Sequence, residues 1–188
     1  MQAAVLGQSP APTRYAPNGH TLDAADFLSE LGERSLRCSA CELVAERMDY
    51  MIPLLVRTWP TRSSAERAKM LRAMLVQRGC KQIDAMHVAL MGDHGSRRFV
   101  DFSGVVQETE LEQRYYVEQA EHVHRLCRIL AKNDVAALVS QMETWQQQEE
   151  GRELRDINMR EEVCVQLLGE CEAEATVNSD EDEDKDEL

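Results

Sequence analysis

The chain has 188 residues, of which 43% are hydrophobic, enough for the core of one ordinary domain and too few for two independent cores. Its formal net charge is −13, but nine acidic residues and one lysine lie between positions 172 and 188, which leaves −5 for the remainder. Read along the chain, no clustered Lys/Arg stripe stands out, so we expect no nucleic-acid partner. No apolar run approaches the ~20 residues of a membrane span.

The N-terminal part divides into two segments. Residues 1–20 hold three of the five prolines among small polar side chains, which predicts a flexible leader. The first ten residues have neither a basic stretch nor a long apolar core, so they do not resemble a signal peptide. Residues 21–34 predict a short extra helix from Thr21 to Leu31, with Gly32 ending it.

The main domain is expected over residues 35–172. Ser35 is the predicted N-cap of a long helix whose apolar side chains recur at helical spacing. Pro53 lies inside this pattern and predicts a kink or an early end. Trp59-Pro60 predicts a turn, and Ser63-x-x-Glu66 is a capping box that begins a second long helix.

The second half of the domain mixes one hairpin with further helices. Between positions 88 and 102 the apolar spacing changes around a glycine-containing centre, which predicts a short β-hairpin. A third helix is expected from about Thr109 to Leu130, and Asn133-Asp134 should break or bend it. The apolar stripe continues to Trp145, and a final helix is expected from Leu154 to Leu168. The predicted fold is therefore mainly α, a helical bundle with a small β-hairpin insertion.

Residues 173–188 predict a disordered acidic tail. The tail ends in a sequence that a receptor reads as an endoplasmic reticulum retrieval signal: Lys185, Asp186, Glu187 and Leu188. Because this signal acts only on a protein that is already in the lumen, we expect a signal peptide that has been removed or is missing from this sequence. The acidic run could also bind Ca²⁺ weakly, although a solvated tether for the signal is the simpler interpretation.

The six cysteines allow fifteen complete pairings, and spacing alone does not choose among them. They are Cys38, Cys41, Cys80, Cys127, Cys164 and Cys171. The first two are separated by three positions and the last two by seven, so each pair is expected to share one helix face. Two antiparallel helices could bring these pairs together in a nested arrangement. Three residues of helix advance ~4.5 Å and seven ~10.5 Å, so one segment must lie near a helix end or cross at an angle.

Two other uses of the cysteines remain open. Cys38-x-x-Cys41 is also the spacing of a redox-active motif, in which the first thiolate is activated at a helix N-terminus. Four thiolates from Cys38, Cys41, Cys164 and Cys171 would suffice for a zinc site. An oxidising compartment favours disulfides over both. His122 and His124 lie on different helix faces and are expected at the surface. We find no catalytic constellation, so we expect a non-enzymatic protein without a cofactor or a metal.

Taken together, these features resemble the canopy family of saposin-like endoplasmic reticulum proteins, which includes a plasma-cell protein that assists immunoglobulin assembly. The resemblance covers about residues 35–188. It rests on Leu36-Arg37-Cys38-Ser39-Ala40-Cys41, then Cys80, the hairpin from Val88 to Phe102, Cys127, Cys164-x6-Cys171 and the terminal Lys-Asp-Glu-Leu.

The resemblance implies a disulfide-stapled, saposin-like helical bundle with the nested pairs Cys38–Cys171 and Cys41–Cys164 and the third pair Cys80–Cys127. It also implies a co-chaperone that works with lumenal heat-shock chaperones on secretory and membrane clients, such as receptors and antibodies. The alternatives are a thiol-disulfide oxidoreductase that uses Cys38 and Cys41, and a saposin-like lipid binder. Fold analogy alone is a weak argument for lipid binding.

Overall fold

The computed structural model describes residues 22–83, 86–102 and 110–173, and for residues 110–117 it describes the backbone alone. The predicted leader (1–20) and the retrieval signal lie outside the described residues, as does the acidic tail except for its first residue. Within the described residues the chain is mainly helical, with one two-stranded sheet and three disulfides. This confirms the predicted disulfide-stapled helical bundle with a small hairpin.

The chain enters the fold through two consecutive helices, α1 (Asp23–Glu30) and α2 (Arg34–Asp49). Gly32 has a φ of 79° and ends α1 as predicted, because glycine adopts this left-handed conformation without a steric penalty. The prediction that Ser35 is the N-cap of α2 is wrong. Glu33 occupies the cap position with an extended backbone, and Ser35 lies in the first turn. The Glu33 carboxylate does not cap the helix, because Arg97 of the hairpin binds it at 2.7 Å.

The predicted early end at Pro53 is confirmed. Helix α2 stops at Asp49, and a separate short helix, α3 (Ile52–Leu55), carries Pro53 near its first position. Proline is tolerated there because the first amide groups of a helix have no intrahelical acceptor. The chain therefore changes direction between α2 and α3 instead of continuing as one rod.

The second long helical segment is built in three parts: α4 (Ser64–Met74), the π-helical η1 (Leu75–Gly79) and α5 (Cys80–Ile83). Its capping box is confirmed: Ser63 Oγ accepts from the Glu66 amide, and the Glu66 carboxylate accepts from the Ser63 amide at 2.9 Å. These two reciprocal hydrogen bonds satisfy amide groups that the helix itself cannot pair.

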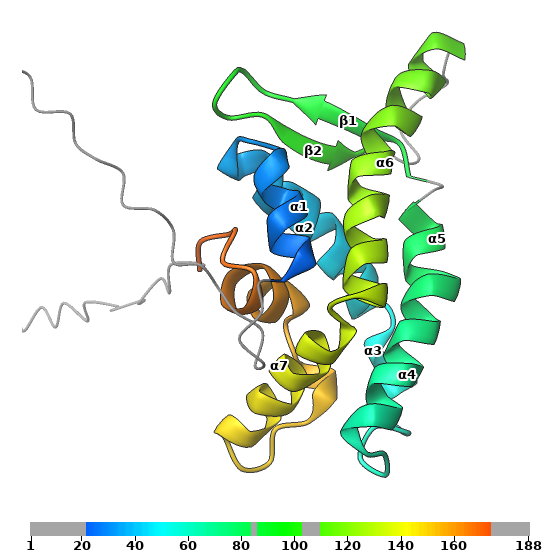
Figure 1. Ribbon diagram of the computed structural model, residues 1–188, viewed down its shortest axis with the longest axis vertical. Coiled ribbons are helices and arrows are strands. Elements are labelled where there is room, and N and C mark those ends of the chain that lie inside the picture. Colours follow the sequence, from blue (N-terminus) through cyan, green and yellow to red (C-terminus); the bar gives the residue numbers. More distant parts are fainter. Residues whose placement is uncertain (1–21, 84–85, 103–109, 174–188) are drawn as a thin grey trace, which may run out of the picture.

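The predicted hairpin is confirmed as the antiparallel strands β1 (Val88–Met91) and β2 (Arg98–Asp101), paired from Val88 with Asp101 to Met91 with Arg98. The hairpin packs on α2: the Phe99 amide donates to Ser39 Oγ at 2.9 Å, and the Phe99 ring is buried. In Figure 1 the hairpin lies at one end of the helical body.

Helix α6 (Glu110–Lys132) is followed by α7 (Val135–Gln148), and the predicted break at Asn133-Asp134 is confirmed. The prediction of one final helix from Leu154 to Leu168 is wrong in part. The structure has a 3₁₀ turn, η2 (Leu154–Asp156), an extended residue at Ile157, and then the π-helical η3 (Arg160–Leu167). Long-range contacts hold this break, because Ile157 is buried and the Met159 amide donates to Asp49 of α2 at 3.3 Å.

Helix α2 lies at the centre of the body and contacts β2, α6 and η3 (Figure 1). The helical segment α4–η1–α5 runs alongside α6, and α1 also packs on α6. One continuous core joins all these elements, so α1 is part of the same domain. The largest fully buried side chains include Trp59, Leu28, Met48, Leu55, Leu126, Leu130 and Met142.

Candidate functional site

The six cysteines form three disulfides. Cys38 of α2 pairs with Cys171, and Cys41 pairs with Cys164 of η3, with Cα–Cα distances of 4.8 and 5.7 Å. The third disulfide, Cys80–Cys127, joins α5 to α6 at a Cα–Cα distance of 5.6 Å. These are the same three pairs that the resemblance implies. The first two link α2 to the end of the described chain and form the nested pair.

The two nested bonds fit together because the chain folds back after η3. Gly169 has a φ of 71°, and the amides of Glu170 and Cys171 both donate to the Cys164 carbonyl, at 2.9 and 3.1 Å. Cys171 therefore lies beyond the helix end, and the expectation that it shares a helix face with Cys164 is wrong. The other expectation, that one segment must lie near a helix end, is confirmed.

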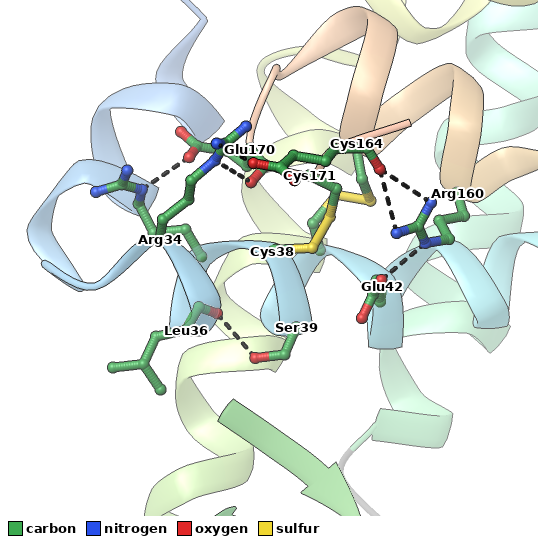
Figure 2. Close-up of a disulfide and its surroundings, with 12 residues drawn as sticks. Arg34, Leu36, Cys38, Ser39, Glu42, Arg160, Cys164, Glu170 and Cys171 are labelled. Carbon is green, nitrogen blue, oxygen red and sulfur yellow. Dashed lines mark hydrogen bonds and ion pairs between the residues drawn. A yellow bond between two sulfur atoms is a disulfide. The ribbon is translucent and has the colours of Figure 1, made fainter. Parts of the chain in front are cut away.

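Ion pairs surround the outer disulfide, Cys38–Cys171 (Figure 2). Arg37 binds Glu170 at 2.7 Å in a half-buried contact, and Arg34 binds Glu172 at 2.8 Å in an exposed one. Figure 2 also shows Arg160 of η3 bound to Glu42 of α2, at 2.7 Å. The C-terminal loop, residues 169–173, is therefore held to α2 by one covalent bond and by charge pairing.

The nested cysteines differ in their exposure. Cys41 and Cys164 have no exposed surface and Cys171 is 4% exposed, whereas Cys38 is half-buried. Cys38 and Cys41, the two members of the Cys-x-x-Cys motif, do not bond to each other, because each is bonded to a distant cysteine. A redox reaction at this motif must therefore begin at an inter-element disulfide, and Cys38 is the sulfur within reach of solvent.

A metal-ligand cluster lies at the same place. Among the described residues, ligand atoms of Cys38, Glu42 and Cys171 all lie within 4.8 Å of one another. Zinc binds thiolate sulfur, and a sulfur that is part of a disulfide offers no thiolate. In the oxidised form this cluster therefore contributes one carboxylate, and the zinc alternative requires that the nested bonds be reduced.

A second candidate site, which the sequence reasoning missed, is a groove of about 680 Å³ beside α3. Two exposed apolar side chains, Tyr50 (63%) and Leu54 (49%), directly follow lining residues of this groove. Exposed apolar side chains near a hollow indicate an interaction surface, and tyrosine is enriched among the residues that dominate protein binding. The groove is lined by Asp49, Ile52, Pro53, Val56, Arg57, Arg155, Ile157 and Asn158.

The sequence held a signal for this groove. Tyr50, Pro53 and Leu54 recur at the i, i+3, i+4 spacing of one helix face, and that face is offset from the buried stripe that holds Met51 and Leu55. Burial of the Asp49 carboxyl at the groove raises its pKa, against the effect of the Met159 amide, which donates to it. Because burial raises this pKa, the protonation of the Asp49 carboxyl should respond to a partner that covers the groove.

The remaining predicted residues fall as follows. His122 is exposed and lies 6.0 Å from the Phe99 ring, while His124 is half-buried, with Nδ1 3.9 Å from the Glu121 carboxylate. Glu162, a residue of η3 that the sequence analysis did not single out, is buried, and burial raises its pKa although Gln141 donates to it at 2.6 Å. These contacts place all three side chains outside the nested pair.

None of the helices in the described part of the chain is long and apolar enough to cross a membrane. Comparison of the chain with protein-family models, with curated proteins and with solved structures finds no match.

Proposed function

We propose that the protein is a non-enzymatic co-chaperone or client adaptor of the endoplasmic reticulum lumen and a member of the canopy family. The observation that carries the proposal is the pairing of all six cysteines across a helical body, in the pattern that the resemblance implies. Stable disulfides are favoured in oxidising compartments. The terminal Lys185-Asp186-Glu187-Leu188 adds a retrieval address for the same compartment.

The proposed partners are folding secretory and membrane proteins, the lumenal heat-shock chaperones and, through the C-terminus, the retrieval receptor. The groove beside α3 is the proposed contact surface. Its lining includes two arginines, Arg57 and Arg155, and the exposed Tyr50 and Leu54 each directly follow a lining residue. Aromatic and arginine side chains dominate binding energy at protein interfaces, so this surface suits an extended or helical segment of a partner.

Proximity labelling in the lumen of cultured cells tests the proposal. The full chain, supplied with a signal peptide, should label lumenal heat-shock chaperones and nascent secretory proteins, identified by mass spectrometry. The double variant Y50S/L54S should lower that labelling several-fold because it removes the two exposed apolar side chains that follow lining residues of the groove. The control V76S/M91S changes two apolar side chains that are exposed elsewhere (38% and 46%) and should label as the unchanged chain does. Labelling of neither partner class by the unchanged chain would refute the proposal.

A second candidate function is thiol-disulfide exchange. The observation that favours it is Cys38, which is half-buried whereas Cys41 and Cys164 have no exposed surface. Changing Cys171 to Ala leaves the Cys38 thiol unpaired, and changing Cys164 to Ala leaves the buried Cys41 thiol unpaired. If exchange is the function, the first variant should trap clients as mixed disulfides on non-reducing gels and the second should not. A gel without adducts in both variants would remove this candidate.

A further inference from the structure

The positive charge of the chain is concentrated in two stretches. Residues 61–83 and 125–132 together hold nine basic side chains and one acidic side chain. Outside these stretches and outside residues 172–188, the chain holds eleven basic and twenty-four acidic side chains. The two basic stretches are therefore an island of positive charge in an acidic protein. About forty residues separate them in the sequence, which is why no basic stripe is visible along the chain.

The fold brings the two stretches together. The Cys80–Cys127 disulfide joins them covalently, and Arg72 of α4 donates to the carbonyls of Ala131 and Lys132 at the end of α6, at 3.3 and 3.1 Å. Figure 1 shows α4 and α5 running beside the C-terminal half of α6. We call the exposed basic side chains of residues 61–83 and 125–132 the basic surface.

Part of this charge is already neutralised inside the body and part is not. Arg67 pairs with Glu143 at 2.7 Å and Arg62 with Glu66 at 3.7 Å, whereas Arg125 lies over the Phe27 ring at 4.7 Å and keeps its charge. Five other exposed side chains of the basic surface form no ion pair with any described residue: Lys69, Arg78, Lys81, Arg128 and Lys132.

The basic surface also has a hollow, of about 330 Å³, on the outer face of α6. Arg125, Arg128 and Lys132 line it at i, i+3 and i+7. Glu121 is the acidic member of the lining, and Ile129 is the apolar one. A hollow that presents three cations from one helix face favours a flexible chain with closely spaced carboxylates.

We propose that the basic surface binds the acidic run Asp180–Asp184 of this chain's own C-terminal segment. Residues 172–188 carry nine acidic side chains and one lysine, whereas residues 61–83 and 125–132 together carry nine basic side chains and one acidic one. The run lies seven to eleven residues after Ala173, so a fully extended chain reaches at most about 25 Å to Asp180 and about 40 Å to Asp184, whereas a body of this size has a radius of gyration of about 15 Å. A tethered segment competes at an effective concentration of the order of mM, ahead of other polyanions.

Carbodiimide cross-linking of the full oxidised chain tests this proposal, because it joins a carboxylate to a lysine amine only where the two are in contact. Mass spectrometry of the monomer band should find Lys69, Lys81 or Lys132 joined to carboxylates of residues 180–187. The yield should fall several-fold between about 0.01 M and about 1 M NaCl, because the Debye length contracts from about 30 to about 3 Å.

Two matched variants locate the binding surface. R125Q/R128Q removes two charges from the basic surface and keeps all its lysines, and the cross-link yield should fall at least severalfold. R57Q/R155Q removes two exposed arginine charges at the groove beside α3, and the yield should not change. Equal yields in the two variants, or a monomer band without these cross-links, would overturn the proposal. Cross-links confined to a covalent dimer would also overturn it, because the occupant would then be the tail of a second copy.

Discussion

The two terminal segments of the described body are attached by different physical means. The C-terminal loop, residues 169–173, is bonded to α2 through Cys38–Cys171 and flanked by ion pairs from Arg34 and Arg37. Helix α1 contains no cysteine and is held by packing on α6 and by the Asp134 carboxylate. The first attachment opens when a disulfide is reduced, whereas the second depends on temperature, denaturant and pH.

The attachment of α1 is a long-range helix cap. Asp134, between α6 and α7, accepts from the amides of Asp23 and Ala24 at 3.3 and 2.7 Å, so a residue about 110 positions away satisfies the first turn of α1. Phe27 and Leu28 are buried beneath it. Because these contacts are individually worth about 1–2 kcal/mol, α1 is expected to open before the covalently closed body does.

The largest expected effect comes from removing both nested disulfides. The two nested bonds, together with residues 38–41 and 164–171, form a ring of twelve residues. When one bond is removed the other still closes the long loop, so only this small ring opens, and the loss is about 3 kcal/mol of unfolding free energy. The remaining bond closes a loop of more than 120 residues, and its loss costs about 5 kcal/mol. The four-cysteine variant should therefore lose about 2 kcal/mol more than the sum of C38A/C171A and C41A/C164A.

Denaturant unfolding of the three variants under non-reducing conditions measures this difference. Additive losses would show that the two bonds constrain the unfolded chain independently, which the nested geometry contradicts. The comparison with α1 is made in the same samples, because hydrogen exchange in residues 23–30 should be nearly unchanged by loss of one nested bond.

Changing Asp134 to Ala should produce the next largest effect, a loss of about 1–2 kcal/mol, because two amides of α1 lose their acceptor. Hydrogen exchange should accelerate in residues 23–30 and stay slow around Cys41 and Cys164. The control is Asn133→Ala, which removes an exposed hydrogen bond to Asp23 and should change little. Equal acceleration in both variants would mean that Asp134 is not the main attachment.

The attachment of α1 should also depend on pH. Burial raises the pKa of Asp134, and the nearby Asp23 and Asp26 carboxylates add to this, although the two amides act in the opposite direction. Its neutral form is thus favoured in the folded protein. The contribution of this protonation preference of Asp134 to the stability of the folded state is complete below the ordinary pKa of 3.8. It is lost as the pH rises through the higher pKa of the folded state. Protection factors in residues 23–30 should fall over that interval, and Asp134→Asn should flatten the profile; an unchanged profile would contradict the assignment.

The smallest effects are expected from the ion pairs that flank the outer disulfide. Arg37→Gln removes a half-buried pair with Glu170 and should cost roughly 0.5–1 kcal/mol, whereas Arg34→Gln removes an exposed pair with Glu172 and should cost close to zero. Thermal unfolding in oxidising buffer ranks the two. A larger loss for Arg34→Gln would show that the C-terminal loop is held chiefly from its exposed side.

Local signals in the sequence were sufficient for several elements. The capping box Ser63–Glu66, the early end near Pro53, the stop at Gly32 and the hairpin from Val88 to Asp101 all depend on residues within a few positions of one another. The break at Asn133-Asp134 is of the same kind. Such signals survive in any tertiary context that leaves the backbone free to follow them.

The errors occur where distant residues decide the local structure. Ser35 loses the cap position because the helix already begins at Arg34, directly after Glu33, whose carboxylate binds Arg97 sixty-four positions away. The predicted final helix is interrupted at Ile157 because that side chain is buried and the next segment hydrogen-bonds to Asp49. Propensity is a weak preference, and a buried contact of this kind overrides it.

Composition, apolar spacing and capping residues act locally, and they are enough to predict a mainly helical, cysteine-linked body with a hairpin. Tertiary structure alone decided how Cys171 returns to Cys164, how Asp134 holds α1, and how two basic stretches forty residues apart become one surface. Each of these depends on contacts between residues far apart in the chain. Their geometry follows from packing of the whole core, which no local pattern encodes.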